Sequence, residues 1–169
     1  FFLSRPNPSC SDGRRNQDET GIDCGGSCQA VCQSEIKPLR SPWARVLKVG
    51  DRFYDAVALV ENPNLNLGVS SLRYSLKFLD QDNLLINERR GETFANQRES
   101  FVVFESNLEV GERVPKRAYF ELLDNELPWR RVTSERPELA FSDETFANLP
   151  TPLFRAKITN RSLKEIKDV

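Results

Sequence analysis

Four cysteines are the residues of this chain best suited to covalent chemistry, and all of them lie within the first 32 of 169 positions. A segment this short buries too little apolar surface to fold unaided, so it needs disulfides or a metal ion as cross-links. Three interpretations are open: two disulfides, a zinc site with four thiolates, or free thiols. The cysteines are Cys10, Cys24, Cys28 and Cys32.

The spacing of these cysteines favours disulfides. Zinc sites usually carry paired C-x2-C spacings, whereas successive cysteines here enclose 13, 3 and 3 residues. Free thiols would lack a histidine to activate them, because the chain contains none. An even number of cysteines among turn-forming Gly, Asp, Asn and Ser residues is typical of a small stapled module. Four cysteines allow three pairings, and the sequence does not choose among them.

Oxygen-bearing side chains crowd the loop between the first two cysteines. Hard cations such as calcium bind to oxygen-rich loops in which glycines permit tight turns. The spacing does not match the EF-hand loop, and acidic side chains in loops also cap turns through their own backbone. We expect no cofactor other than calcium, which stays a candidate beside the turn-capping role. Its candidate ligands are Asp12, Asn16, Asp18, Glu19 and Asp23.

Residues 10–32 form the run C-x-D-G-x-x-N-x-D-E-T-G-x-D-C-G-G-x-C-x-x-x-C. This run resembles a small cysteine-rich module of exported and surface-anchored microbial proteins, which often reads N-G-D-E-T-D-x-D-C-G-G. Gln17 replaces the glycine of that pattern and Gly21 replaces an aspartate. The resemblance implies an exported location and no particular activity. Disulfides persist in oxidising compartments outside the cytosol, which agrees with an exported location.

The overall composition argues against two classes of function. Lysine and arginine (24) nearly balance aspartate and glutamate (25), so no global positive field attracts nucleic acid. The absence of histidine removes the commonest general base and a common metal ligand. No catalytic constellation stands out elsewhere. We therefore expect no enzyme, no catalytic residues and no nucleic-acid partner.

The first residues predict a link to a membrane. The start Phe-Phe-Leu is apolar and runs into a polar, proline-containing stretch, and the chain has no methionine. We interpret residues 1–9 as a stalk or the end of a membrane anchor, with the membrane reached through a segment N-terminal to Phe1. The expected location is the extracellular or periplasmic face of that membrane.

The rest of the chain carries strand patterns. The clearest is Ser71–Phe78, where apolar and polar residues alternate and predict a sheet with one solvated face. Lys37–Pro42 contains two prolines and is interpreted as a linker after a Cys-rich module over residues 10–36. The fold class is therefore all-β, with an antiparallel β-sandwich over residues 41–137. The other expected strands are Ala44–Val49, Phe53–Glu61, Leu84–Glu88, Phe101–Glu105, Arg117–Leu123 and Trp129–Thr133.

A short repeat predicts that a second sandwich begins near residue 138. Ala-Leu-Val-Glu-Asn at residues 58–62 parallels Ala-Lys-Ile-Thr-Asn at residues 156–160, an offset close to the length of one immunoglobulin-like domain. Val-Glu-Asn-Pro-Asn followed by Leu-Arg-Tyr-Ser-Leu-Lys-Phe-Leu-Asp resembles the Ig-like sandwiches of the FxLYD and LEA14-like type. That resemblance implies non-enzymatic modules of surface and envelope proteins. Residues 138–169 are expected to start the second sandwich or to donate a strand to a partner.

These observations predict a non-enzymatic, exported, membrane-anchored surface protein that acts as a structural or adhesive module. One alternative is a subunit of an envelope or filament assembly whose terminal sheet is completed by a partner chain. Another is a carbohydrate or small-molecule binding module. Other envelope or surface proteins are the expected partners. Trp43 and Trp129 belong either to the core or to an exposed aromatic platform for such a partner.

Overall fold

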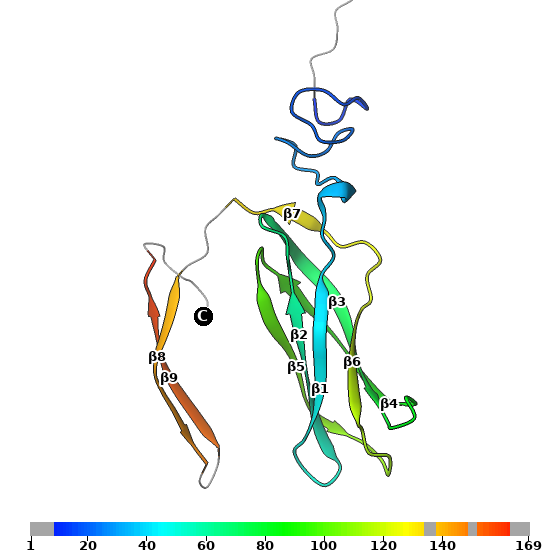
Figure 1. Cartoon of the computed structure of the whole chain (residues 1–169), viewed down its shortest axis with the longest axis vertical. Helices are drawn as coiled ribbons and strands as arrows, with labels where there is room; N and C mark the ends of the chain where they lie inside the picture. The colour runs from blue at the N-terminus through cyan, green and yellow to red at the C-terminus, as the bar shows by residue number, and fades with distance from the viewer. Residues whose placement is uncertain (1–8, 134–137, 149–151, 163–169) are drawn as a thin grey trace, which may run out of the picture. The chain divides into compact units, whose positions relative to one another are not determined.

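The computed structural model describes residues 9–133, 138–148 and 152–162 (Figure 1). The expected stalk at residues 1–8 and the expected continuation of a second sandwich at residues 163–169 lie outside the described residues. The chain divides after Val132 into two compact units. Its elements are η1 (Gln33–Glu35), β1 (Arg40–Lys48), β2 (Phe53–Glu61), β3 (Leu67–Leu79), β4 (Leu85–Ala95), β5 (Ser100–Glu109), β6 (Arg117–Leu122), β7 (Trp129–Arg131), β8 (Leu139–Ala147) and β9 (Leu153–Asn160).

Two antiparallel sheets of the first unit enclose one core, so the predicted all-β fold class is confirmed. One sheet has the order β1–β2–β5, and the other has the order β4–β3–β6 with the short β7 paired to the start of β3 (Figure 1). Buried side chains of β2 and β5 pack against those of β3 and β6. The arrangement is a β-sandwich compatible with an Ig-like topology.

The alternating pattern of β3 places its apolar side chains in that core. Leu72, Tyr74, Leu76 and Phe78 are all buried, as their spacing predicts. Burial of each such side chain contributes about 1.5–3 kcal/mol to folding. Tyr74 lies opposite Gly91 on β4, where a Cβ atom would collide with the phenol ring. β4 continues through this glycine to Ala95, beyond the expected end at Glu88.

The start of β1 differs from the sequence prediction. Residues 40–42, expected in a linker, belong to the strand, and the pairing with β2 shifts register between Arg40 and Trp43. Pro42 lies within this irregularity. β1 pairs only with β2 among the described strands, so it is an edge strand. Proline is tolerated at such an edge because the missing N–H donor breaks no ladder bond.

The second unit is a single hairpin of β8 and β9. Its turn after β9 repeats the turn after β2: the backbone N–H of Ser162 donates to Asn160 Oδ1 at 2.9 Å, as that of Asn64 donates to Asn62 Oδ1 at 3.0 Å. These two asparagines are the ends of the sequence repeat. In β2 the repeat residues 58 and 60 are fully buried, whereas Ile158 of β9 is 53% exposed. β9 thus repeats the residue pattern of β2, but its apolar residues are not covered by a second sheet among the described residues.

Candidate functional site

The four cysteines form two disulfides, as expected. Cys10 is bonded to Cys28 and Cys24 to Cys32, and the sulfurs of the interleaved pairs lie in a module with little regular structure. Cys28 and Cys32 are nearly inaccessible to solvent. These cross-links replace the apolar core that so short a segment cannot form. They also indicate an oxidising, exported environment, because thiols stay reduced in the cytosol.

Close backbone packing explains the two glycines after Cys24. Gly25 and Gly26 both have positive φ, which residues with a Cβ rarely adopt. A Cβ at Gly25 would collide with the side chain of Thr20, and one at Gly26 with the backbone carbonyl of Asp18. The Cys-Gly-Gly part of the motif is thereby required for the compact path of the loop.

The candidate calcium ligands hold the loop together through hydrogen bonds. Asp23 accepts the backbone N–H groups of Asp12 and Gly13, each at 2.9 Å, and Glu19 accepts that of Asn16 at 3.0 Å. Oxygen atoms of these carboxylates therefore stabilise turns, which is the alternative role considered for them.

Two further candidate ligands have partners of their own. Asp12 accepts hydrogen bonds from the Asn16 side chain at 2.8 Å and from the backbone N–H of Arg14 at 2.9 Å. Asp18 accepts a hydrogen bond from the Ser27 hydroxyl at 2.8 Å, and this bond lowers the pKa of Asp18. Side-chain oxygen Oδ1 of Asn16 is buried and has no hydrogen-bond partner among the described residues.

One glutamate lies beside a disulfide. The sulfur atoms of Cys10 and Cys28 and a carboxylate oxygen of Glu19 lie within 4.8 Å of one another. The two sulfurs are bonded to each other, so neither offers the thiolate that a zinc ion requires. Glu19 is only 5% exposed, and its other carboxylate oxygen accepts the backbone N–H of Asn16.

Polar contacts fix the Cys-rich module to the sandwich. Arg131 of β7 donates to Glu35 of η1 at 2.6 Å, and both side chains are about three-quarters buried. Asn64, after β2, exchanges two hydrogen bonds with the backbone of Lys37 at 2.9 and 2.7 Å. Asn62 accepts from the side chain of Asn64 at 2.9 Å, which orients that side chain. The module and the sandwich therefore form one unit, as the division of the chain also indicates.

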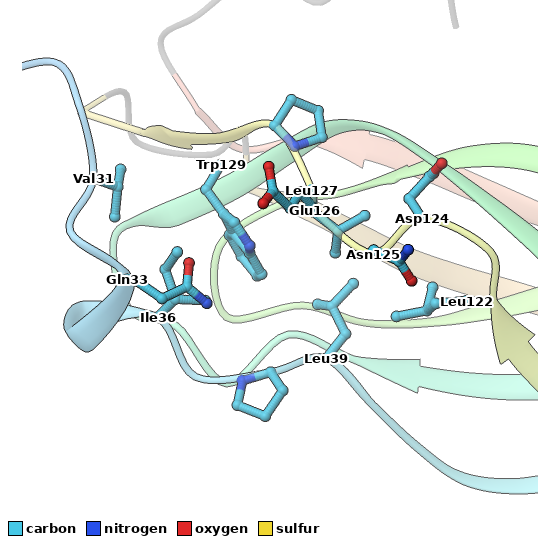
Figure 2. Close-up of a pocket in the computed structure, with 12 residues that line it drawn as sticks. Val31, Gln33, Ile36, Leu39, Leu122, Asp124, Asn125, Glu126, Leu127 and Trp129 are labelled. Atoms are coloured by element: carbon cyan, nitrogen blue, oxygen red, sulfur yellow. The ribbon is translucent and has the colours of Figure 1, made fainter.

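A pocket of about 950 Å³ opens beside this junction. Figure 2 shows the indole of Trp129 directed into it from β7, with Leu39 directed toward the indole from the start of the β1 segment. Most of the other lining side chains are apolar, and Gln33, Asp124, Asn125 and Glu126 supply polar atoms. The only local signal in the sequence was Leu-Pro-Trp at residues 127–129, which indicates a strand start and not a pocket.

The outer face of the β1–β2–β5 sheet is apolar. Leu59 of β2 pairs with Trp43 on one side and with Val102 on the other. Val57, two residues earlier on the same face, pairs with Phe104. Val102 and Phe104 are more than half exposed. We call the residues Trp43, Val57, Leu59, Val102 and Phe104 the apolar outer face.

The outer face of the opposite sheet is charged. The guanidinium of Arg73 lies 2.7 Å from Asp124, and hydrogen bonds from the backbone and side chain of Arg73 lower the pKa of that carboxyl. Lys77 pairs with Glu121, which raises the pKa of Lys77. Such a network is the ordinary solvated face of an antiparallel sheet. This sheet also exposes Phe94 and Tyr119, but each has a charged residue two positions away on its own strand.

The two tryptophans have different positions. Trp129 packs against the core from the pocket side, whereas Trp43 lies on the apolar outer face with the guanidinium of Arg45 4.9 Å from its ring centre. Trp129 thus belongs to the core, whereas Trp43 lies partly exposed on the outer side of the sheet. Strand alternation could have assigned Trp43, because its partner Leu59 faces away from the buried residues 58 and 60 of β2.

The fold and these surfaces define an all-β protein in which a disulfide-stapled module is joined to a β-sandwich. No family model, curated protein or solved structure matches the chain. Among the described residues, none of the helical segments is long and apolar enough to cross a membrane.

Proposed function

We propose that this chain is a non-enzymatic structural or adhesive module of an exported protein, held at the outer face of a membrane on its N-terminal side. The observation that carries this proposal is the apolar outer face. Two of its residues, Val102 and Phe104, keep 53% and 54% of their surface exposed. Apolar surfaces of this kind mark places where a protein associates with another protein.

The stapled module supports the exported location. Its two disulfides need an oxidising compartment, and its polar contacts with the sandwich give the sandwich a fixed base. A sandwich on a rigid base suits a structural role, because a load on one part is transmitted to the other.

Cell fractionation tests this proposal. In the producing cells the protein is expected in the envelope fraction and accessible to protease added outside the cytoplasmic membrane. A soluble cytoplasmic protein that resists external protease until lysis would contradict the proposal. Replacement of Trp43 and Phe104 by serine is expected to leave export unchanged and to lower retention of the purified protein on isolated envelopes, whereas Arg45→Ser serves as a control on the same face.

A second candidate function is favoured by the hairpin of β8 and β9. Phe141, Phe146, Phe154 and Ile158 lie on one side of this hairpin, and each is more than half exposed. An isolated two-stranded hairpin is marginal in water, and these side chains gain stability only when another sheet covers them. This observation supports a subunit of an envelope or filament assembly whose terminal sheet is completed by a partner chain.

Ligand binding in the Trp129 pocket is the third candidate. An indole beside polar rim groups suits a sugar or another small molecule. Titration of a glycan panel against tryptophan fluorescence tests it, with Trp129→Phe as the variant and Trp43→Phe as the matched control. A fluorescence response that survives Trp129→Phe and vanishes with Trp43→Phe would place the ligand elsewhere.

A further inference from the structure

β6 presents an open edge. Among the described strands it pairs only with β3, at the end of the β4–β3–β6 order. The backbone N–H of Leu123 donates to Arg73 of β3, and antiparallel pairing alternates from there. The backbone groups of Ala118, Phe120 and Leu122 are therefore directed away from β3. The side chains of the same three residues point into the core, so this edge offers hydrogen bonds beside an apolar surface.

A cleft of about 190 Å³ lies along this edge. Phe120 and Leu122 of β6 line one side, and Leu39 of the segment entering β1 lines the other. Leu39 and Leu122 also line the Trp129 pocket, so the cleft and the pocket share one apolar border. β1 lies close to β6 along this border, but the two strands are not paired with each other, so the edge-directed backbone groups of β6 have no strand partner among the described residues.

The edge of β4 is protected by contrast. Glu88, Arg90 and Glu92 stand on or near it, and Arg90 is ion-paired with Glu88. Charged side chains on an edge strand oppose the addition of another strand. β6 carries Ala118, Tyr119 and Phe120 at its centre, and its charged residues, Arg117 and Glu121, lie toward its two ends, where Glu121 is paired with Lys77 of β3.

β9 supplies a matching edge. Among the described strands it pairs only with β8, and the backbone N–H of Arg161 donates to Glu138. Alternation from that bond directs the backbone groups of Ile158 away from β8. The side chain of Ile158 belongs to the exposed apolar side of the hairpin and is 53% exposed. Ile158, whose backbone groups are available for pairing, thus has an apolar side chain, as the corresponding residues of β6 do.

We propose that β9 of a second copy of this chain adds, antiparallel, to the open edge of β6, with Ile158 opposite Phe120. Residues opposite each other in a sheet share a face, so Ile158 then covers the cleft. The same register places Lys157 opposite Glu121, an attractive pair of opposite charges. Reciprocal exchange between two copies gives a closed two-fold dimer. This inference rests on the assembly role proposed above and names the partner as a second copy.

Molar mass in solution tests the proposal on the full chain. Sedimentation equilibrium over a range of concentrations is expected to show reversible formation of a species of twice the 19.4 kDa chain mass. Ile158→Lys is expected to weaken this dimer at least about tenfold, because an ammonium group would be buried in the cleft. Thr159→Lys adds the same charge to the other face of β9 and is the matched control, expected to remain dimeric.

A second variant acts on the other partner. Ala118→Pro removes one edge-directed N–H while the N–H groups that bond β3 stay in place, and proline is tolerated on edge strands. It is expected to abolish the dimer with circular dichroism unchanged. If it fails to fold, Ile158→Lys decides alone.

Two results overturn the proposal: a monomer at all concentrations, or a dimer that persists in Ile158→Lys. If the protein is monomeric, protection of the β6 edge amides from hydrogen exchange would mean that a strand from the same chain occupies the edge. None of these results bears on export or surface exposure, so failure here is distinguishable from failure of the proposed function.

Discussion

The guanidinium of Arg131 lies 2.6 Å from the carboxylate of Glu35, although 96 residues separate them in the sequence. This ion pair joins the last strand of the sandwich to the short helix at the end of the Cys-rich module. Both side chains are about 24% exposed, so solvent screens the pair only in part. It is one of the contacts that fix the module to the sandwich, beside the hydrogen bonds of Asn64 with Lys37.

Removal of this ion pair should loosen the module. Arg131→Met leaves Glu35 without its partner, and the segment at residues 36–38, between η1 and β1, should become more accessible to limited proteolysis. We expect cleavage there to be several-fold faster, with an unfolding free energy lower by about 1–3 kcal/mol. Arg130→Met, at an exposed neighbour, is the control. Equal cleavage rates for both variants would show that other contacts hold the module.

Alkaline titration should reveal the link between the two sheets. Tyr74 donates its hydroxyl to Glu105 of β5 at 2.7 Å, and burial together with this bond raises the pKa of Tyr74 to about 12. The folded pKa lies above the unfolded value of about 10, so this contribution to stability is complete below pH 10 and is lost between pH 10 and 12. Ultraviolet absorbance should show one tyrosine that ionises near pH 12. A titration that Tyr74→Phe leaves unchanged would contradict this assignment.

Two phenylalanines separate core from surface. Phe78 is fully buried, so Phe78→Ala should lower the unfolding free energy by about 3–5 kcal/mol. Phe104, on the apolar outer face, is 54% exposed, and Phe104→Ala should change the unfolding free energy by about 0.5 kcal/mol or less. Urea unfolding of the two variants measures the difference. A large loss for Phe104→Ala would mean that its side chain supports the fold and is not kept for a partner.

Metal removal should leave the Cys-rich module unchanged. Asp12, Glu19 and Asp23 already accept backbone N–H groups, so the loop has its stabilising contacts without an ion. Thermal unfolding with a chelator is expected to match unfolding with added calcium. A midpoint that rises with calcium, and no longer does so in Asp23→Asn, would instead establish a calcium site.

Local patterns in the sequence predicted the strands well. Leu72, Leu76 and Phe78 are buried because alternation is a property of each strand by itself. Pro42 misled the prediction, since its place in β1 depends on β1 being at the edge of a sheet. Edges are set by which strands pair, and such pairing is not encoded in any short segment.

The candidate site was less predictable for the same reason. The number of cysteines indicated disulfides, but the partner of Cys10 depends on the path of the whole loop. The Trp129 pocket and the ion pair of Arg131 with Glu35 join segments about 90 residues apart. No spacing rule connects residues at that separation. Only the three-dimensional arrangement reveals them.

Disulfide mapping tests the central claim, that a stapled module places this sandwich outside the cytoplasm. The protein should be isolated from its own cells with an alkylating agent present from lysis onward, then digested without reductant. The account predicts linked peptides that join Cys10 to Cys28 and Cys24 to Cys32, with no alkylated cysteine. Four alkylated cysteines would show a reduced cytoplasmic protein and would contradict it.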